Sequence, residues 1–143
     1  MTEEEVFDSP RDWVAAHIRR YIETDGEDGH LWRGVPTLLL TTRGRRSGKL
    51  RRTALIYGRD GDRYVVVAST GGADRHPRWY LNLVADPSVR VQAGAARFTA
   101  WARTASPEEK ARLWPMMTGE WPAYDEYQTR TTRAIPVVIL EAA

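Results

Sequence analysis

Six short runs rich in branched and small apolar residues constrain the fold of this chain most. Each has the length and composition of a β-strand, and they span residues 36–42, 53–58, 64–69, 89–92, 97–103 and 135–140. The pair Asp60-Gly61 and the glycine Gly94 predict two hairpins, over residues 53–69 and 89–103. Consecutive hairpins with a helix between them are not an alternating strand–helix pattern. They predict an α+β fold in which about six mainly antiparallel strands close into a small barrel.

Three or four helices are expected beside this sheet. An apolar face that includes Trp13 and His17 follows the start signal Ser9-Pro10-Arg11-Asp12, and Gly26 is the predicted stop. Pro77 predicts a second helix that ends before Pro87. The remaining signals are a capping box at Ser106–Glu109, a kink or end at Pro115, a short helix near Pro122, and Pro136 at an edge or at the start of the last strand.

The length of 143 residues fits one domain, residues 1–143, in which residues 1–30 form an acidic N-terminal tail, expected to be loose over residues 1–8, and a helix. The chain has no cysteine, so we expect no disulfide and no thiolate site. The first eight residues hold four acids and no base, unlike a secretory signal peptide. No apolar run reaches the roughly eighteen residues of a membrane span. We therefore expect a cytoplasmic protein.

Charge is concentrated in the middle of the sequence. Residues 1–30 carry nine acids and three Arg, whereas residues 31–103 carry fourteen Lys and Arg and four Asp. The most basic part is Thr41–Thr53, the basic segment, in which six of thirteen residues are cationic and none is acidic. Such a density of guanidinium groups favours an anionic ligand, since Arg binds phosphate and carboxylate through paired hydrogen bonds. A solvated connector remains the alternative.

Two familiar phosphate-binding motifs are excluded. Gly44–Lys49 is one residue too short for a P-loop, Leu50 stands where a metal-binding hydroxyl is required, and a strand follows in place of a helix. No dinucleotide fingerprint follows a predicted strand. The three histidines are not at metal-ligand spacing, so we expect no metal site, and His17 is predicted to pack in the core.

Two further stretches could line a ligand site. The sequence Ser69-Thr70-Gly71-Gly72 connects a strand to a helix, and its glycines would allow close approach of the backbone to a planar ligand. Trp121, Tyr124 and Tyr127 are spaced by three, which places them on one helical face. They are either a core stripe or an aromatic wall with phenol donors.

The order of five motifs resembles the deazaflavin-dependent nitroreductase and quinone reductase family, whose members use coenzyme F420. The resemblance covers roughly residues 33–141. The matching stretches are Leu39–Thr42 with Gly44–Gly48, Arg51 with Thr53–Tyr57, Tyr64–Ser69 with Gly71-Gly72, His76-Pro77 with Trp79–Leu83, and Pro122–Tyr124 with Tyr127-Gln128.

The resemblance implies a split β-barrel and hydride transfer from reduced F420 to a quinone, a nitroaromatic or an enone. It implies that Arg45, Arg46, Ser47 and Arg51 hold the phosphate and acidic tail of the coenzyme. The ring would lie along Thr53, Ala54, Leu55 and Ile56, along Ala68, Ser69 and Thr70, and beside Arg78, Trp79, Tyr80, Leu81 and Asn82. The substrate pocket would include Ser69, Trp121, Tyr124 and Tyr127, with Ser69, Tyr124 and Tyr127 as the catalytic candidates.

Two departures from the family pattern concern contacts to the coenzyme and to the substrate. Thr70 stands where some members have Lys, and Trp121 stands where the nitroimidazole-activating member has Tyr. Thr70 implies the loss of one contact to the tail or ring of the coenzyme, whereas Trp121 leaves F420 binding unaffected, and together they argue against nitroimidazole reduction. The N-terminal helix associates with membrane in some members, but its acidic start favours a protein free of the membrane here. The alternatives are an FMN-binding split-barrel oxidoreductase and a basic barrel that binds nucleic acid. The sequence leaves the oligomeric state open.

Overall fold

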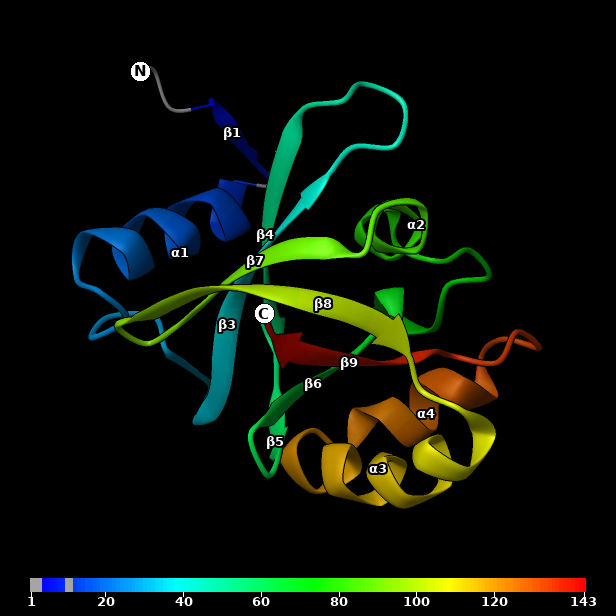
Figure 1. The fold of residues 1–143 in the computed structure, drawn as a ribbon. Helices are drawn as coiled ribbons and strands as arrows, with labels where there is room; N and C mark the ends of the chain where they lie inside the picture. The colour runs from blue at the N-terminus through cyan, green and yellow to red at the C-terminus, as the bar shows by residue number, and fades with distance from the viewer. Residues whose placement is uncertain (1–3, 10–11) are drawn as a thin grey trace.

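The computed structural model describes residues 4–9 and 12–143, which form one large sheet with helices around it (Figure 1). Over these residues the nine strands are β1 (Val6–Asp8), β2 (Leu31–Trp32), β3 (Val35–Arg43), β4 (Leu50–Ile56), β5 (Gly58–Asp60), β6 (Arg63–Val67), β7 (Ser88–Ala93), β8 (Ala96–Thr104) and β9 (Val137–Ala142). The four α-helices and one 3-10 turn are α1 (Asp12–Glu23), η1 (Thr70–Gly72), α2 (Arg78–Ala85), α3 (Pro107–Glu120) and α4 (Ala123–Thr129).

The strand order is β1-β4-β3-β7-β8-β9-β6-β5, and β2 pairs with β3 outside this path. All pairs are antiparallel except β1 with β4. The mainly antiparallel α+β class and the number of helices are therefore confirmed. The prediction of a closed barrel is wrong. In the described part of the chain no strand pairing joins β4 to β6, so the sheet stays open between these two strands, and we call this gap the seam.

The three strands that were not expected are two or three residues long. One of them corrects the prediction of a loose acidic tail, since Val6–Asp8 pairs in parallel with Leu50–Arg52 of β4. Its acids meet bases of the basic segment: Arg52 Nε donates to Asp8 at 2.6 Å, and Arg43 donates to both carboxylate oxygens of Glu4 at 2.6 and 2.9 Å. Charge complementarity accounts for the ordering of this short edge strand.

The hairpin predicted over residues 53–69 is only partly correct. Its turn forms between β5 and β6 at Gly61, but residues 53–56 of β4 pair with β3 instead of β6. Tyr57, which is buried, separates β4 from β5, and the chain passes there from one end of the strand order to the other. The hairpin of β7 and β8 around Gly94 is confirmed.

Helix boundaries agree with the capping signals except at Pro115. The capping box of Ser106 and Glu109 is present, and α2 begins directly after Pro77. Helix α3 continues through Pro115 to Glu120, because Leu113 and Met117 hold the turns on either side of it in the core. Pro10 and Arg11 of the predicted first cap lie outside the described residues. None of the described helices is long and apolar enough to cross a membrane.

Two apolar layers lie on opposite faces of the sheet. Val66, Val138 and Leu140 face the layer that α2 covers, whereas their neighbours in the same strands face a second layer beneath α3 and α4. This alternation is the period of two that a strand imposes on its side chains. Helix α1 packs on a third cluster over β3 and β4. Figure 1 shows α1 on one side of the sheet seam and α3 with α4 on the other.

Candidate active site

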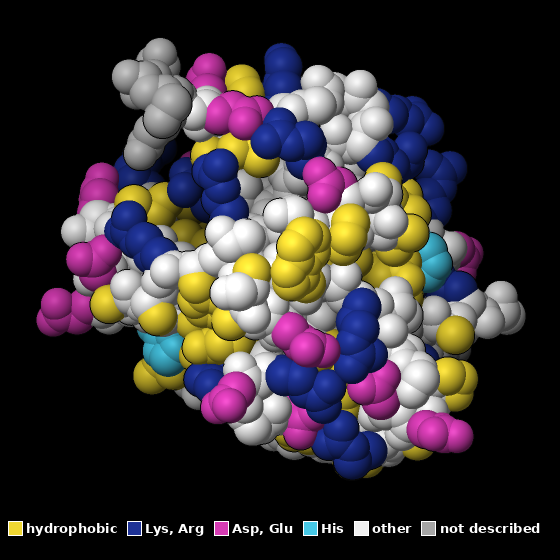
Figure 2. Space-filling model, viewed as in Figure 1, with side chains coloured by type: hydrophobic (Ala, Val, Ile, Leu, Met, Phe, Trp, Pro, Cys, Tyr) yellow, Lys and Arg dark blue, Asp and Glu magenta, His cyan; other side chains and the backbone are white. Residues whose placement is uncertain are grey.

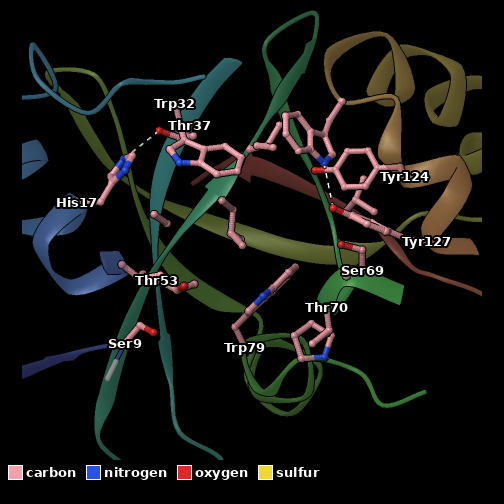
Figure 3. Close-up of a pocket in the computed structure, with 18 of the residues that line it drawn as sticks. Ser9, His17, Trp32, Thr37, Thr53, Ser69, Thr70, Trp79, Tyr124 and Tyr127 are labelled. Carbon is pink, nitrogen blue, oxygen red and sulfur yellow. Dashed lines mark hydrogen bonds between the residues drawn. The ribbon is translucent and has the colours of Figure 1, made fainter. Parts of the chain in front are cut away.

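The principal cavity of the described chain has a volume of about 400 Å³ and lies along the open seam of the sheet. Its walls come from helix α1, strands β2 and β4, the segment from β6 to η1, the start of α2, and the α3–α4 junction (Figure 3). The structure brings ten of the predicted site residues together here, namely Thr53, Ala54, Leu55, Ile56, Ser69, Thr70, Trp79, Trp121, Tyr124 and Tyr127.

Strand β4 offers backbone groups to this cavity because β1 covers only Leu50–Arg52. Tyr57 N donates to Pro36 O on the β3 side, while Arg52 O accepts from Ser9 N on the opposite side. Groups along an antiparallel strand alternate in direction, so the N–H and C=O of Ala54 and Ile56 point away from β3. Among the residues that the structure describes, none pairs with these groups of Ala54 and Ile56, so this strand edge offers the cavity both hydrogen-bond donors and acceptors.

The opposite wall is aromatic. Trp121 Nε1 donates to the Tyr127 hydroxyl at 3.3 Å, and the rings of Tyr124 and Tyr127 meet edge to face at 6.1 Å. Burial, and then the neighbouring Tyr127, raise the pKa of Tyr124, so its hydroxyl stays protonated at neutral pH. In Figure 3 the side chains of Ser69, Tyr124 and Tyr127 lie close together on this side of the cavity. Three hydroxyl groups are thus available within an otherwise apolar wall.

The loop that carries Ser69 has an uncommon backbone. Thr70, Gly71 and Gly72 have φ angles of 46°, 61° and 83°, which is the left-handed region. A Cβ added to Gly72 would lie 2.7 Å from Tyr127 O, so only glycine allows η1 to approach α4 this closely. The close approach sets the spacing between the Ser69 loop and the aromatic wall.

A further wall, which the sequence reasoning did not assign to the site, comes from α1 and β2. Trp13, Val14 and His17 of α1 and Trp32 of β2 all line the cavity. Trp32 lies between Trp13 and Trp121, at centroid separations of 6.1 and 5.2 Å, and these three rings form the tryptophan row. His17 is buried, as predicted, and its Nε2 lies 2.8 Å from Gly29 O. An apolar helix face looks the same in sequence whether it meets the core or a cavity.

The basic segment forms the hairpin between β3 and β4, away from the cavity floor. Arg45, Arg46 and Ser47 are exposed at its tip, and Figure 2 shows Lys and Arg gathered at this end of the molecule. Arg51 follows on β4, where its guanidinium lies 5.4 Å from the centre of the Phe7 ring. In the described chain no acid forms an ion pair with these three arginines, whereas Arg43 and Arg52 are paired.

Asn82 joins this hairpin to α2. Its Oδ1 accepts from Arg45 N at 3.1 Å, and its Nδ2 donates to Thr42 Oγ1 at 3.2 Å. Both ends of the buried amide are therefore already engaged within the protein. The other predicted residues that do not line the cavity are Ala68, which is buried, Arg78, which is exposed, and Tyr80 and Leu81, which lie further along α2.

Comparison with known proteins agrees with this architecture. A family model described as F420H(2)-dependent quinone reductase matches residues 13–142. The chain belongs to this family. An F420H2-dependent quinone reductase of Mycobacterium tuberculosis (strain ATCC 25618 / H37Rv) is 44% identical over 128 residues, which cover 87% of this chain and 86% of that protein.

Two solved structures resemble the fold at 42% identity. One is described as an F420-H2 dependent reductase (FDR-A), with a TM-score of 0.69 over 74% of this chain and 94% of that one. The other is described as a domain-swapped dimer, with a TM-score of 0.72 over 93% of this chain and all of that one. Membership in the F420H2-dependent quinone reductase family confirms the resemblance inferred from sequence, the oxidoreductase class and the coenzyme.

Proposed function

We propose that this chain reduces a quinone with reduced F420, that the cavity holds the deazaflavin ring and the acceptor, and that the β3–β4 hairpin holds the charged tail of the coenzyme. The observation that supports this most is the position of the cavity at the part of the β4 edge that no other described strand covers. An edge with exposed N–H and C=O groups beside an apolar wall suits a flat ring that has one polar edge.

The residues present fit the coenzyme in size and in chemistry. A cavity of about 400 Å³ lies within the roughly 300–1,000 Å³ typical of sites for small molecules. The backbone of Ala54 and Ile56 would bind the polar edge of the ring, and Trp79 would cover one of its faces. When bound, reduced F420 supplies a hydride, so the protein's main task is to position donor and acceptor.

The arrangement of the arginines supports a tail that runs along β4 to the hairpin. Arg51 precedes Thr53 by two residues, so their side chains leave β4 on the same face, about 7 Å apart along the strand. Arg45 and Arg46 stand at the tip, held near α2 by the hydrogen bond to Asn82. Three guanidinium groups without acidic partners in the described chain would bind the phosphate and carboxylates of the tail.

The hydroxyl groups would act on the acceptor. Negative charge develops on a quinone oxygen as it is reduced, and preorganised donors in a dry site stabilise such charge. Trp121 donates to the Tyr127 oxygen, which leaves the Tyr127 proton available for a bond to the acceptor. In our proposal Ser69 and Tyr124 supply further donors. The proton that completes reduction comes from one of the tyrosines or from water.

The alternatives predict different observations. FMN in place of F420 would give a yellow protein as purified, and the family match favours F420. Binding of nucleic acid would need bases stacked on exposed aromatic residues and a steep salt dependence. Most of the aromatic residues instead pack around the cavity and in the core. Nitroaromatics remain a predicted second class of acceptor, with Trp121 and Thr70 as the departures that argue against nitroimidazoles.

Three further features belong to the same proposal. We propose that residues 1–143 work as a single domain, that the fold is a split barrel whose seam stays open for the coenzyme, and that the protein is cytoplasmic. The common sheet of all nine described strands supports the first two. The mass of the protein in solution would show whether two copies exchange segments. A monomeric mass would distinguish this chain from the domain-swapped dimer that it resembles.

The experiment is a titration of the purified protein with F420, followed by its fluorescence, and turnover of F420H2 with menadione. Saturable binding at micromolar coenzyme is expected, and its absence would refute the proposal. Arg51→Ala should weaken binding by about tenfold, with a smaller loss in high salt, because a charge-assisted contact is removed. Arg97→Ala, which removes an exposed arginine paired with Asp25, is the matched control.

Tyr124→Phe tests the catalytic part separately. It should lower kcat by about tenfold or more, since it removes one donor from the developing charge, and should leave the affinity for F420 nearly unchanged. An equal loss in kcat and in coenzyme affinity would place Tyr124 in the coenzyme site and contradict its assignment to the acceptor.

A further inference from the structure

One guanidinium group holds most of the loop that carries Ser69. Arg133, in the segment between α4 and β9, donates from Nε to Ala73 O at 2.7 Å, from Nη2 to Ser69 O at 2.7 Å, and from Nη1 to Ala68 O at 3.2 Å. Its Nη1 also lies 3.0 Å from His76 Nδ1. The planar fork of an arginine can satisfy several acceptors at once in this way, which a lysine cannot.

The imidazole of His76 is a fixed acceptor in this arrangement. Arginine can only donate, so Nδ1 of His76 accepts and its proton lies on Nε2. Burial, followed by the nearby Arg133, lowers the pKa of His76, which keeps the ring neutral near pH 7. The ring also packs against Tyr80 at a centroid separation of 4.9 Å.

The backbone of Arg133 is itself anchored to α4. Gln128, in the last turn of α4, donates from Nε2 to Arg133 O at 2.8 Å and accepts from Ile135 N at 3.0 Å. Arg133 N donates to Thr131 Oγ1 at 3.2 Å. Because α4 also carries Tyr124 and Tyr127, the position of Arg133 is tied to the aromatic wall of the cavity.

The loop on the other side of Arg133 needs such support. Thr70 is a β-branched residue in the left-handed region, which is an unfavourable backbone conformation that persists only when its surroundings impose it. Within the described chain η1 itself has two backbone hydrogen bonds, each between residues three apart in sequence. They run from Gly72 N to Ser69 O and from Ala73 N to Thr70 O. The carbonyl groups on either side of this turn are the ones that Arg133 binds.

We propose that Arg133 is a positioning residue, which fixes the Ser69 loop against the α4 wall and thereby sets the distance between the catalytic hydroxyl groups of the cavity. Arg133 is not itself among the described residues that line the cavity, so its effect passes through Ser69, whose carbonyl it binds, and through η1. The catalytic part of this inference rests on the proposed function, whereas the clamp on the loop does not.

Hydrogen–deuterium exchange on the 143-residue chain tests this clamp, the set of hydrogen bonds from Arg133 to the Ser69 loop, without coenzyme. In Arg133→Gln the amides of Gly72 and Ala73 should exchange about tenfold faster or more, because bonds donated by a charged group are among the stronger ones. The matched control is Arg112→Gln, which removes a guanidinium that donates twice to Asp60 on the outer side of α3. Arg133→Lys keeps the charge and loses the fork, so it should lie between the wild type and Arg133→Gln.

Kinetics then test the positioning role. Arg133→Gln should lower kcat for F420H2 with menadione by about tenfold or more, since small displacements of catalytic groups are costly. The Kd for F420 should change by less than about threefold, because the charged tail is bound elsewhere. Partial recovery of kcat in Arg133→Lys, with no loss in Arg112→Gln, would support the inference.

Two results would overturn it. Unchanged amide exchange at Gly72 and Ala73 in both Arg133 variants would show that Arg133 does not hold the Ser69 loop in place. A parallel fall of kcat, coenzyme affinity and Tm would reduce Arg133 to a general contributor to stability. Failure of the wild-type protein to oxidise F420H2 would contradict the proposed function alone, since the exchange measurement stands without it.

Discussion

The close approach of η1 to α4 allows a prediction with a built-in control. Gly71 and Gly72 are adjacent and both left-handed, with φ angles of 61° and 83°. A Cβ at Gly71 would meet nothing within 4 Å, whereas one at Gly72 would lie 2.7 Å from Tyr127 O and 3.0 Å from Tyr127 Cα. The two alanine substitutions therefore share their backbone cost and differ in one steric contact.

The expected magnitudes follow from these two contributions. Alanine in the left-handed region costs roughly 1–2 kcal/mol, partly offset by about 0.4–1 kcal/mol because the unfolded chain becomes less flexible. Gly71→Ala should then lower the free energy of unfolding by about 1 kcal/mol or less. Gly72→Ala adds a clash with backbone atoms that cannot rotate away, and overpacking of this kind costs typically about 1–3 kcal/mol. We expect a total of about 3 kcal/mol for Gly72→Ala.

Urea or thermal unfolding measures the difference directly. At about 2–4 °C per kcal/mol for a chain of this size, Gly72→Ala should melt several degrees below Gly71→Ala. Turnover with menadione should fall further in Gly72→Ala, because separating η1 from α4 moves Ser69 away from Tyr127. Equal Tm values for the two variants would refute the tight contact, and with it the account of how the two walls are spaced.

Three further predictions concern other parts of the chain. Ser106→Ala removes one half of the capping box of α3 and should cost about 1 kcal/mol in the free energy of unfolding, measured in urea. Hydrogen bonds from Arg112 and then Arg63 lower the pKa of Asp60 to about 2 from 3.8. Its contribution to stability is therefore present above about pH 4 and is lost as the pH falls toward 2, and Asp60→Asn should flatten this part of the acid unfolding curve. Trp32→Ala removes the middle of the tryptophan row, so KM for bulky quinones should fall relative to that for menadione while the Kd for F420 stays constant.

Much of the fold could be predicted because its signals are local. The turn at Gly61, the hairpin at Gly94 and the capping box at Ser106 each depend on residues that are neighbours in the sequence. The strands β1, β2 and β5 were missed because two or three residues carry no periodic pattern. The partner of residues 53–56 was predicted wrongly because the turn at Gly61 joins only β5 to β6, whereas these residues pair with the preceding strand, β3.

The candidate site, like the fold, was predicted correctly only in part. Residues of β4, of the Ser69 loop and of the α4 wall were expected together, and the structure brings them to one cavity. The wall from α1 and β2 was missed. Trp13 and His17 lie on an amphipathic helix face, and such a face does not show whether it packs on the core or lines a cavity. Asn82 was expected at the ring, but its amide is engaged by the hairpin and by β3. That difference is one of hydrogen-bond geometry, which a sequence does not contain.

The open seam connects these observations. An unpaired strand edge is normally a liability, because its free N–H and C=O groups can pair with another chain. Here β1 covers the first part of β4, and Asp8 in β1 and Glu4 just before it form ion pairs with Arg52 and Arg43. The remaining part of β4 is enclosed by α1, by the tryptophan row and by the α4 wall. A sheet that closed fully would pair the backbone of Ala54 and Ile56 with β6 and remove the polar groups to which we assign the edge of the coenzyme ring in the proposed function. The N-terminal segment therefore has two effects: it covers one end of the edge, and it pairs with Arg43 and Arg52 while Arg45, Arg46 and Arg51 have no acidic partner in the described chain and, in our proposal, bind the tail of the coenzyme.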